Sequence, residues 1–156
     1  MPYYPPLGWI GIGLKVMDKY EDNIWIGMEN CEGEWCVAYH GVGHFKKSNE
    51  IKQIAKNIYK GGFKKGSGQE HEHCNDLNHP GKKVGEGVYC TSKIEKAEEY
   101  AGIVDIKGKR YKLVLMVRVN PKKIRYCEHE EKDYWVVSGT KDDIRPYRIL
   151  YKECNY

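Results

Sequence analysis

The clearest strand signal in the sequence is KRYKLVLMVRV, residues Lys109–Val119. Two interleaved sets of side chains alternate along it: Tyr111, Leu113, Leu115, Val117 and Val119 against Lys112, Val114, Met116 and Arg118. Successive side chains of a strand point to opposite faces of a sheet, and β-branched residues favour strands. This stretch therefore predicts the longest strand of the chain.

Further strands are expected on both sides of this stretch, where short runs are rich in β-branched and aromatic residues. Pro146 cannot donate a backbone hydrogen bond, so it predicts that the last strand lies at a sheet edge or starts late. Gly8–Val16 reads as a strand or as an irregular lead-in. The other expected strands are Asn23–Met28, Trp35–His40, Val88–Cys90, Ile124–Cys127, Tyr134–Val137 and Ile144–Lys152.

A first helix is expected after residue 48, where Ser48 or Asn49 can cap it and Gly61-Gly62 ends it. Its apolar face would consist of Ile51, Ile54, Ala55 and Ile58. The polar stretch Lys64–Gly87 follows, and a loop of that length in a compact domain is usually functional or mobile.

A second helix is expected from Ser92, because Ser92 and Glu95 match a Ser-x-x-Glu capping box, and it would run to about Ala101. Strands do not alternate regularly with helices, so a doubly wound parallel sheet is disfavoured. We expect one α+β domain over residues 1–156, with a lead-in at 1–30 and a core at 35–151. Two packed, mostly antiparallel β-sheets would carry short flanking helices.

Composition excludes several classes of protein. Hydrophobic residues make up 40% of the 156 residues, which argues against disorder, and no apolar run approaches the length of a membrane span. A net charge of +4 is too small to predict nucleic-acid binding. The abrupt N-terminus carries no secretory signal, so we expect an intracellular protein, cytoplasmic or nuclear, that is consistent with one domain of a longer chain.

Two groups of residues leave alternatives open at this point. Without a secretory signal, the six cysteines are expected to be free thiols. The basic residues near the polar stretch indicate either a solvated loop or a positively charged entrance to a cleft that attracts an anionic ligand such as a dinucleotide. These basic residues are Lys60, Lys64, Lys65, Lys82 and Lys83.

Three short patterns carry residue types that suit chemistry. Tyr39-His40-Gly41 ends a predicted strand, where a glycine lets a ligand approach the backbone. Gly87-x-Tyr89 precedes a helix with Ala97 and Tyr100, and two such tyrosines can enclose a flat aromatic group. An acidic run ends at Asp133, before the strand Tyr134–Val137, and a carboxylate there can stabilise an oxocarbenium-like sugar. Taken alone, the first pattern favours an ordinary strand end and the third a solvated acidic turn, while the second fits core packing as well as it fits a site.

In this order and spacing, the three patterns resemble the ADP-ribosyltransferases of the diphtheria toxin and poly(ADP-ribose) polymerase type. The resemblance spans roughly residues 35–151 and implies NAD as substrate, bound between two small antiparallel sheets. It implies that Gly41 holds the nicotinamide carboxamide and His40 the adenosine-side ribose. Tyr89, Ala97 and Tyr100 would line the nicotinamide, and Lys64–Gly87 would lie over the donor.

The resemblance implies a catalytic set of His40, Tyr89 and a carboxylate at the start of the third pattern. Asp133 stands where the family usually has Glu, so its carboxylate is one methylene shorter, and Glu131 or Glu130 is the alternative. The expected activity is transfer of single ADP-ribose units, with release of nicotinamide, to an acceptor, and a protein acceptor is favoured over nucleic acid. No membrane partner is expected.

Three other readings stay open. The first is a catalytically weak or inactive NAD-binding module of the same fold, and the second is an NAD-dependent RNA 2′-phosphotransferase. The third is a metal site, whose residue types would be His71, His73, Cys74 and His79. Their spacing matches no common zinc pattern, so no metal is expected.

Overall fold

The computed structural model describes residues 5–42, 73–128, 134–138 and 141–155, with four further positions in the first predicted helix. Those four, Gln53, Lys56, Asn57 and Lys60, are helical and exposed, as the polar face of the predicted helix should be. Its apolar face, its cap and its terminal glycines lie outside the described residues.

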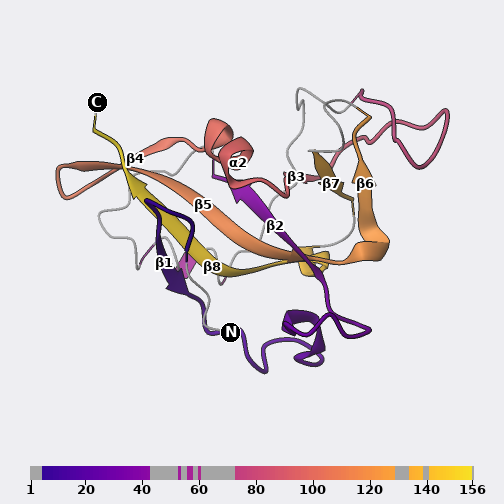
Figure 1. The fold of residues 1–156 in the computed structure, drawn as a ribbon, viewed down its shortest axis with the longest axis horizontal. Coiled ribbons are helices and arrows are strands. Elements are labelled where there is room, and N and C mark those ends of the chain that lie inside the picture. The colour runs from indigo at the N-terminus through magenta and orange to yellow at the C-terminus, as the bar shows by residue number, and fades with distance from the viewer. Residues whose placement is uncertain are drawn as a thin grey trace.

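The large sheet is built around β5 (Lys109–Val119), whose bounds are those expected from the sequence. All its pairs are antiparallel, in the order β1-β8-β5-β2, with β4 also paired to β5 (Figure 1). The partners are β1 (Ile10–Gly13), β2 (Cys36–Gly41), β4 (Ile103–Ile106) and β8 (Ile144–Glu153).

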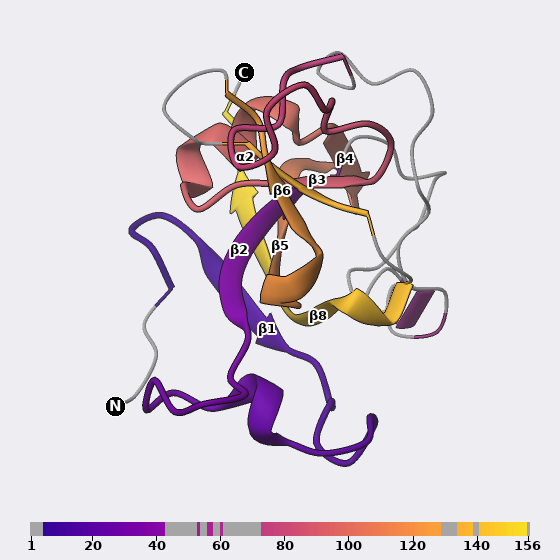
Figure 2. The same ribbon diagram turned by 90° about the vertical axis from the view of Figure 1, so that its right-hand side faces the viewer.

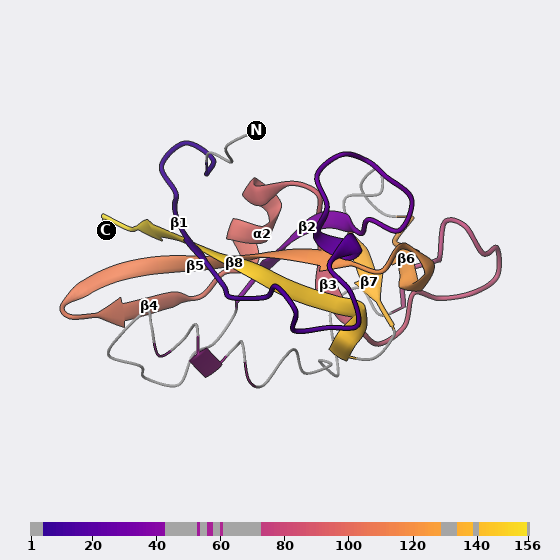
Figure 3. The ribbon, with the colours of Figure 1, turned by 90° about the horizontal axis from the view of Figure 1, so that it is seen from below.

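The small sheet has three short antiparallel strands in the order β3-β7-β6: β3 (Val88–Cys90), β6 (Ile124–Tyr126) and β7 (Trp135–Val137). It lies at one end of the large sheet, and the β4–β5 hairpin lies at the other (Figures 1 and 3). A single bridge between Tyr39 and Thr91 joins β2 to the residue after β3. The expected α+β class with two antiparallel sheets is confirmed.

The two faces of β5 support different parts of the molecule. Leu115, Val117 and Val119 lie in a buried cluster with Val88 and Val137 of the small sheet. Val114 and Met116, which point the other way, lie in a second buried cluster with Ile94 and Ala97 of helix α2 (Ile94–Tyr100). Burial of these apolar surfaces is the main stabilising term that holds the small sheet and α2 against the large sheet.

The expected strand Asn23–Met28 is wrong, because Ile24–Ile26 form the 3-10 helix η1. Asp22 Oδ1 accepts a hydrogen bond of 2.8 Å from the Ile24 backbone N–H, which favours a turn over a strand. Trp25 is buried while Ile24 is exposed. Trp25 is therefore the residue of this turn that packs into the interior.

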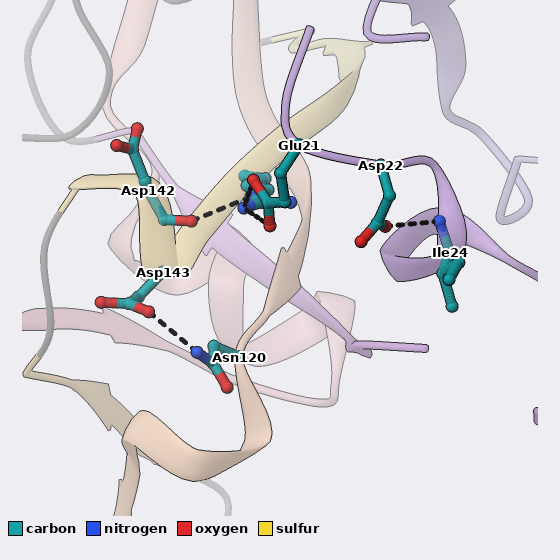
Figure 4. A network of polar contacts seen from close by, with 7 residues as sticks. Glu21, Asp22, Ile24, Asn120, Asp142 and Asp143 are labelled. Atoms are coloured by element: carbon teal, nitrogen blue, oxygen red, sulfur yellow. Dashed lines mark hydrogen bonds and ion pairs between the residues drawn. The ribbon is translucent and has the colours of Figure 1, made fainter. Parts of the chain in front are cut away.

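Two arginines anchor the part of the lead-in around η1, which lies at the end of the molecule opposite α2 (Figure 2). Arg145 donates to Oε1 of Glu21, which Figure 4 labels, at 2.7 Å. The Arg145 guanidinium lies over the rings of both Tyr20 and Trp35, 4.0 Å from each ring centroid. Asn120 and Asp143, also drawn in Figure 4, are joined by a hydrogen bond of 2.9 Å beside this network. The hydrogen bond to Arg145 lowers the pKa of Glu21 from its ordinary value.

The second anchor is Arg118, which is buried and donates to three backbone carbonyls. Its acceptors are the carbonyl oxygens of Trp35 at 2.7 Å, Gly27 at 2.8 Å and Ile26 at 3.4 Å. Charged donors aimed at carbonyls fix an irregular segment that has no sheet partners of its own.

Two local predictions are corrected. The Ser92–Glu95 capping box does not form: Lys93 is the N-cap of α2, and Thr91 Oγ1 accepts from the Lys93 backbone N–H at 3.1 Å. β8 starts at Ile144 and lies between β1 and β5, so Pro146 neither delays it nor places it at the sheet edge. The register shifts beside Pro146, and such an irregularity accommodates a missing N–H donor.

The free-thiol prediction is wrong for two of the six cysteines. Cys74 and Cys127 form a disulfide, and Cys31, Cys36, Cys90 and Cys154 are free. Sequence spacing gave no sign of this pair, whose members are separated by 53 residues. Among the described residues, no helix is both long and apolar enough to cross a membrane.

Candidate functional site

The first two sequence patterns meet where β2 passes the small sheet. Tyr39 and Thr91 exchange two backbone hydrogen bonds, of 2.8 Å and 3.0 Å. One residue further along β2, the His40 Nδ1–H donates to the Tyr89 carbonyl at 2.7 Å. His40 and Tyr89 are 49 residues apart in the sequence, and this contact places them side by side.

The same contact sets the state of the His40 ring. Burial lowers the pKa of His40 from its ordinary value, and the hydrogen bond to the Tyr89 carbonyl opposes this shift only in part. Since a carbonyl can only accept, Nδ1 carries the proton of the neutral ring. Nε2 therefore keeps a lone pair that can accept a hydrogen bond from a hydroxyl group.

Gly41 lies where β2 passes closest to helix α2. A Cβ added to it would meet the Ala97 carbonyl oxygen, at 2.1 Å, and the Ala101 nitrogen, at 3.0 Å. The sequence suggested that this glycine admits a ligand. The structure gives it a packing role in addition, because no side chain fits between β2 and α2 here.

The backbone groups of Gly41 face the edge of β2 away from β5. Val42 N donates to Leu113 O of β5, whereas Tyr39 bonds to Thr91 on the other side. Backbone groups alternate in direction along a strand, so Gly41 N–H and C=O point to the same side as those of Tyr39. A planar amide approaching that edge would find one donor and one acceptor.

Tyr100 contacts Tyr134, the residue that follows Asp133 in the third sequence pattern. It ends α2, is 45% exposed, and donates its hydroxyl to the Tyr134 hydroxyl at 3.1 Å. The two rings meet edge to face, with centroids 6.0 Å apart and an interplanar angle of 83°. Tyr134 is only 6% exposed and directly precedes β7, so it is a fixed support for the more exposed Tyr100.

Tyr89 is hydrogen-bonded to Gly85, which belongs to the polar stretch Lys64–Gly87. Its hydroxyl donates to the Gly85 carbonyl at 3.2 Å, and its ring packs against a buried cluster of Val84, Cys127, Tyr134 and Val136. Tyr134 therefore contacts Tyr100 and belongs to the cluster against which Tyr89 packs. The sequence predicts Tyr134 only as the first residue of a strand, and a tyrosine directly after an acidic run is the signal that could have pointed to it.

The remaining predicted site residues are placed unequally. Ala97 is buried in the cluster with Val114 and Met116, and its contact with a ligand stays a prediction. The carboxylates Asp133, Glu131 and Glu130 lie outside the described residues. The described residues that flank them in the sequence are Glu128 and Tyr134.

The metal alternative loses one of its residues. Cys74 is in a disulfide, so its sulfur is not available as a thiolate ligand. His79 Nδ1 is 2.8 Å from Oδ2 of the buried Asp76, while His71 lies outside the described residues. Within the described ranges, no group of three or more metal-binding residue types is assembled.

A scan against protein-family models finds no family that matches this chain, and a search of curated proteins finds no relative. The assignment of a function rests on the residue patterns and on the contacts that join them.

Replacing Gly41 with alanine tests the close approach of β2 and α2. Because the added carbon would meet helix backbone, which cannot rotate away, we expect Gly41→Ala to lower the free energy of unfolding by about 2–3 kcal/mol. The matched control is Gly13→Ala in β1, where a Cβ meets nothing within 4 Å, and a change within about 0.5 kcal/mol is expected. Urea unfolding measures both, and equal losses would contradict the packing.

The lowered pKa of His40 predicts a pH dependence of stability. The unfolded state binds a proton near pH 6.5, whereas the native state does so only at lower pH. The stabilisation is therefore complete above about pH 6.5 and is lost as the pH falls toward the native value, by up to about 1.4 kcal/mol per pH unit. His40→Asn keeps an N–H donor without titrating, so its urea-unfolding curve from pH 7.5 to 5.5 should be flatter than that of wild type. Parallel curves would refute this role.

Proposed function

We propose that this chain is an NAD-binding domain of the ADP-ribosyltransferase type, with the dinucleotide seated against His40, Tyr89 and Tyr100. One observation carries the proposal. The His40–Tyr89 bond of 2.7 Å joins the first sequence pattern to the second, and the Tyr100–Tyr134 bond of 3.1 Å joins the second to the third. Three segments that a family resemblance requires to be neighbours are neighbours in the fold.

The chemistry of each group suits one part of NAD. The N–H and C=O of Gly41 offer the donor and acceptor that a carboxamide needs, and the tyrosine rings offer flat faces for a nicotinamide cation. Nε2 of the neutral His40 ring is an acceptor by its chemistry, which suits a ribose hydroxyl as donor. The lowered pKa of His40 favours this neutral ring near neutral pH.

The proposed reaction breaks the bond between nicotinamide and ribose. The cationic nicotinamide departs with the bonding electron pair and becomes neutral, which leaves an oxocarbenium-like ribose. A carboxylate from Asp133, or from Glu131, would stabilise that positive charge near the 2′-hydroxyl. An acceptor nucleophile then bonds to the anomeric carbon and loses its proton. We propose a protein side chain as acceptor and transfer of single units.

A binding module without catalysis is the second candidate. It is favoured by Asp133, because a carboxylate withdrawn by about the 1.5 Å of one C–C bond can cost about 100-fold in rate. The RNA 2′-phosphotransferase alternative has less support. It requires a set of basic side chains to hold RNA phosphates, and the one group of basic residues that the sequence singles out lies in and beside a single polar loop.

Nicotinamide release from NAD, measured beside calorimetric binding of NAD, tests the proposal. Tyr89→Ala should weaken binding by about 10-fold or more, because it removes one aromatic wall. Asp133→Ala should bind NAD as wild type does and lose release. The matched control is Tyr111→Ala, since Tyr111 packs with Tyr151 in a separate cluster at the β4–β5 end.

The possible results separate the candidates. Binding without release by wild type would replace the transferase with the binding module. Absence of binding at millimolar NAD would overturn the proposal, and an equal loss in Tyr111→Ala would show that the Tyr89 effect is only structural.

A further inference from the structure

We propose that the Cys74–Cys127 disulfide is a redox-controlled support for the tyrosines of the candidate site, and that a dithiol reductant switches the site to a low-affinity state. The part of this proposal that concerns NAD affinity rests on the proposed function. The part that concerns the support of the tyrosines does not.

The buried half of the disulfide lies beside Tyr134. Cys127 is completely buried in one cluster with Val84, Tyr134 and Val136. Its backbone N–H donates to the Tyr134 carbonyl at 3.0 Å. The Tyr134 hydroxyl accepts a hydrogen bond from the Tyr100 hydroxyl. A displacement of Cys127 would therefore move Tyr134, the residue that fixes Tyr100.

The other half of the disulfide supports Tyr89. The Cys74 carbonyl accepts from Val84 N at 2.9 Å, and Arg125 Nη1 donates to the Val84 carbonyl at 3.0 Å. The next residue, Gly85, accepts the hydroxyl of Tyr89 at 3.2 Å. The disulfide thus joins the two segments that separately hold Tyr89 and Tyr100.

The segment between these anchors has little other support from apolar burial. From residue 75 to residue 83, Asp76 is the one buried residue, and Leu77 is only partly buried. Two backbone bonds link this segment to the chain around Cys127: Leu77 N to Tyr126 O at 2.9 Å and Glu128 N to Asn75 O at 3.0 Å. Segments with few buried apolar contacts open at low free energy, so the covalent bond is the dominant local constraint. By contrast, β5 is buried on both faces and does not depend on it.

The reaction follows from the exposure of the two cysteines. Cys74 is partly exposed and Cys127 is buried, so a reductant thiolate attacks the Cys74 sulfur and Cys127 leaves as thiolate. The second thiolate of the reductant then attacks the mixed disulfide and releases Cys74. In balance, the dithiol gives up two electrons and two protons, becomes a disulfide, and leaves two thiols on the protein.

Amide hydrogen exchange of the oxidised and reduced protein, with calorimetric NAD binding on the same samples, tests this proposal. We expect exchange over residues 75–85 and in β3 to accelerate by about 10-fold or more on reduction, while exchange in β5 stays unchanged. We expect the Kd for NAD to rise by about 10-fold.

Two variants serve as matched controls. The double variant Cys74→Ser, Cys127→Ser should behave as the reduced protein in both conditions, because it cannot form the bond. Cys31→Ser, which removes an exposed free thiol, should respond to the reductant as wild type does.

Unchanged exchange and unchanged affinity on reduction would overturn the proposal. Equal acceleration of exchange in β5 would also overturn the proposal, because the disulfide would then stabilise the whole fold and not specifically the segments that hold Tyr89 and Tyr100. If NAD binds equally in both redox states, the redox control fails while the proposed function stands. If neither state binds NAD but exchange changes as expected, the proposed function fails and the support role of the disulfide stands.

Discussion

The two-sided burial of β5 is the constraint on which the arrangement of the candidate site depends. One face of the strand packs against the small sheet and the other against α2, while its edges pair with β2 and β8. His40 is placed by the register of β2 on β5, Tyr89 by the small sheet, and Tyr100 by α2. A change in the packing of β5 would therefore move all three residues relative to one another.

Close contacts where β2, α2 and the small sheet meet leave little room for these elements to move relative to one another. Gly41 admits no side chain against α2, and Gly87 is in the same position against β7, where a Cβ would lie 2.5 Å from the Val137 carbonyl. Tyr134 then fixes the exposed Tyr100 by a ring contact and a hydrogen bond. Under the proposed function, these contacts preorganise the aromatic surface on which nicotinamide would stack, so less of the binding energy is spent on ordering side chains.

The sequence predicts the fold well where the signal is local and repeated. The alternation in Lys109–Val119 gives β5 with its observed bounds. The bounds of β2, β3, β6, β7 and β8 are recovered to within one residue, whereas β1 is shorter than the expected Gly8–Val16. It fails where one side-chain contact decides the outcome, as with Asp22 at η1 and Thr91 at the start of α2. β4 is missing from the expected strands, because its turn, Lys107-Gly108, shows its positive φ angles only in the structure.

For the site, the order of the patterns predicts which segments are neighbours but not how they touch. Tyr100 and Tyr134 are 34 residues apart, and Cys74 and Cys127 are 53 apart, so neither contact follows from local spacing. The expected carboxylate at Asp133 or Glu131 stays a prediction, as does the identity of the acceptor.

Titration of isotope-labelled protein with NAD, followed by NMR, is the sharpest test of whether NAD binds at the His40–Tyr89–Tyr100 junction. If NAD binds there, the amide signals of Gly41, Tyr89 and Tyr100 shift together, while those of the β4–β5 turn do not. Shifts confined to other parts of the chain, or none at millimolar NAD, would contradict it.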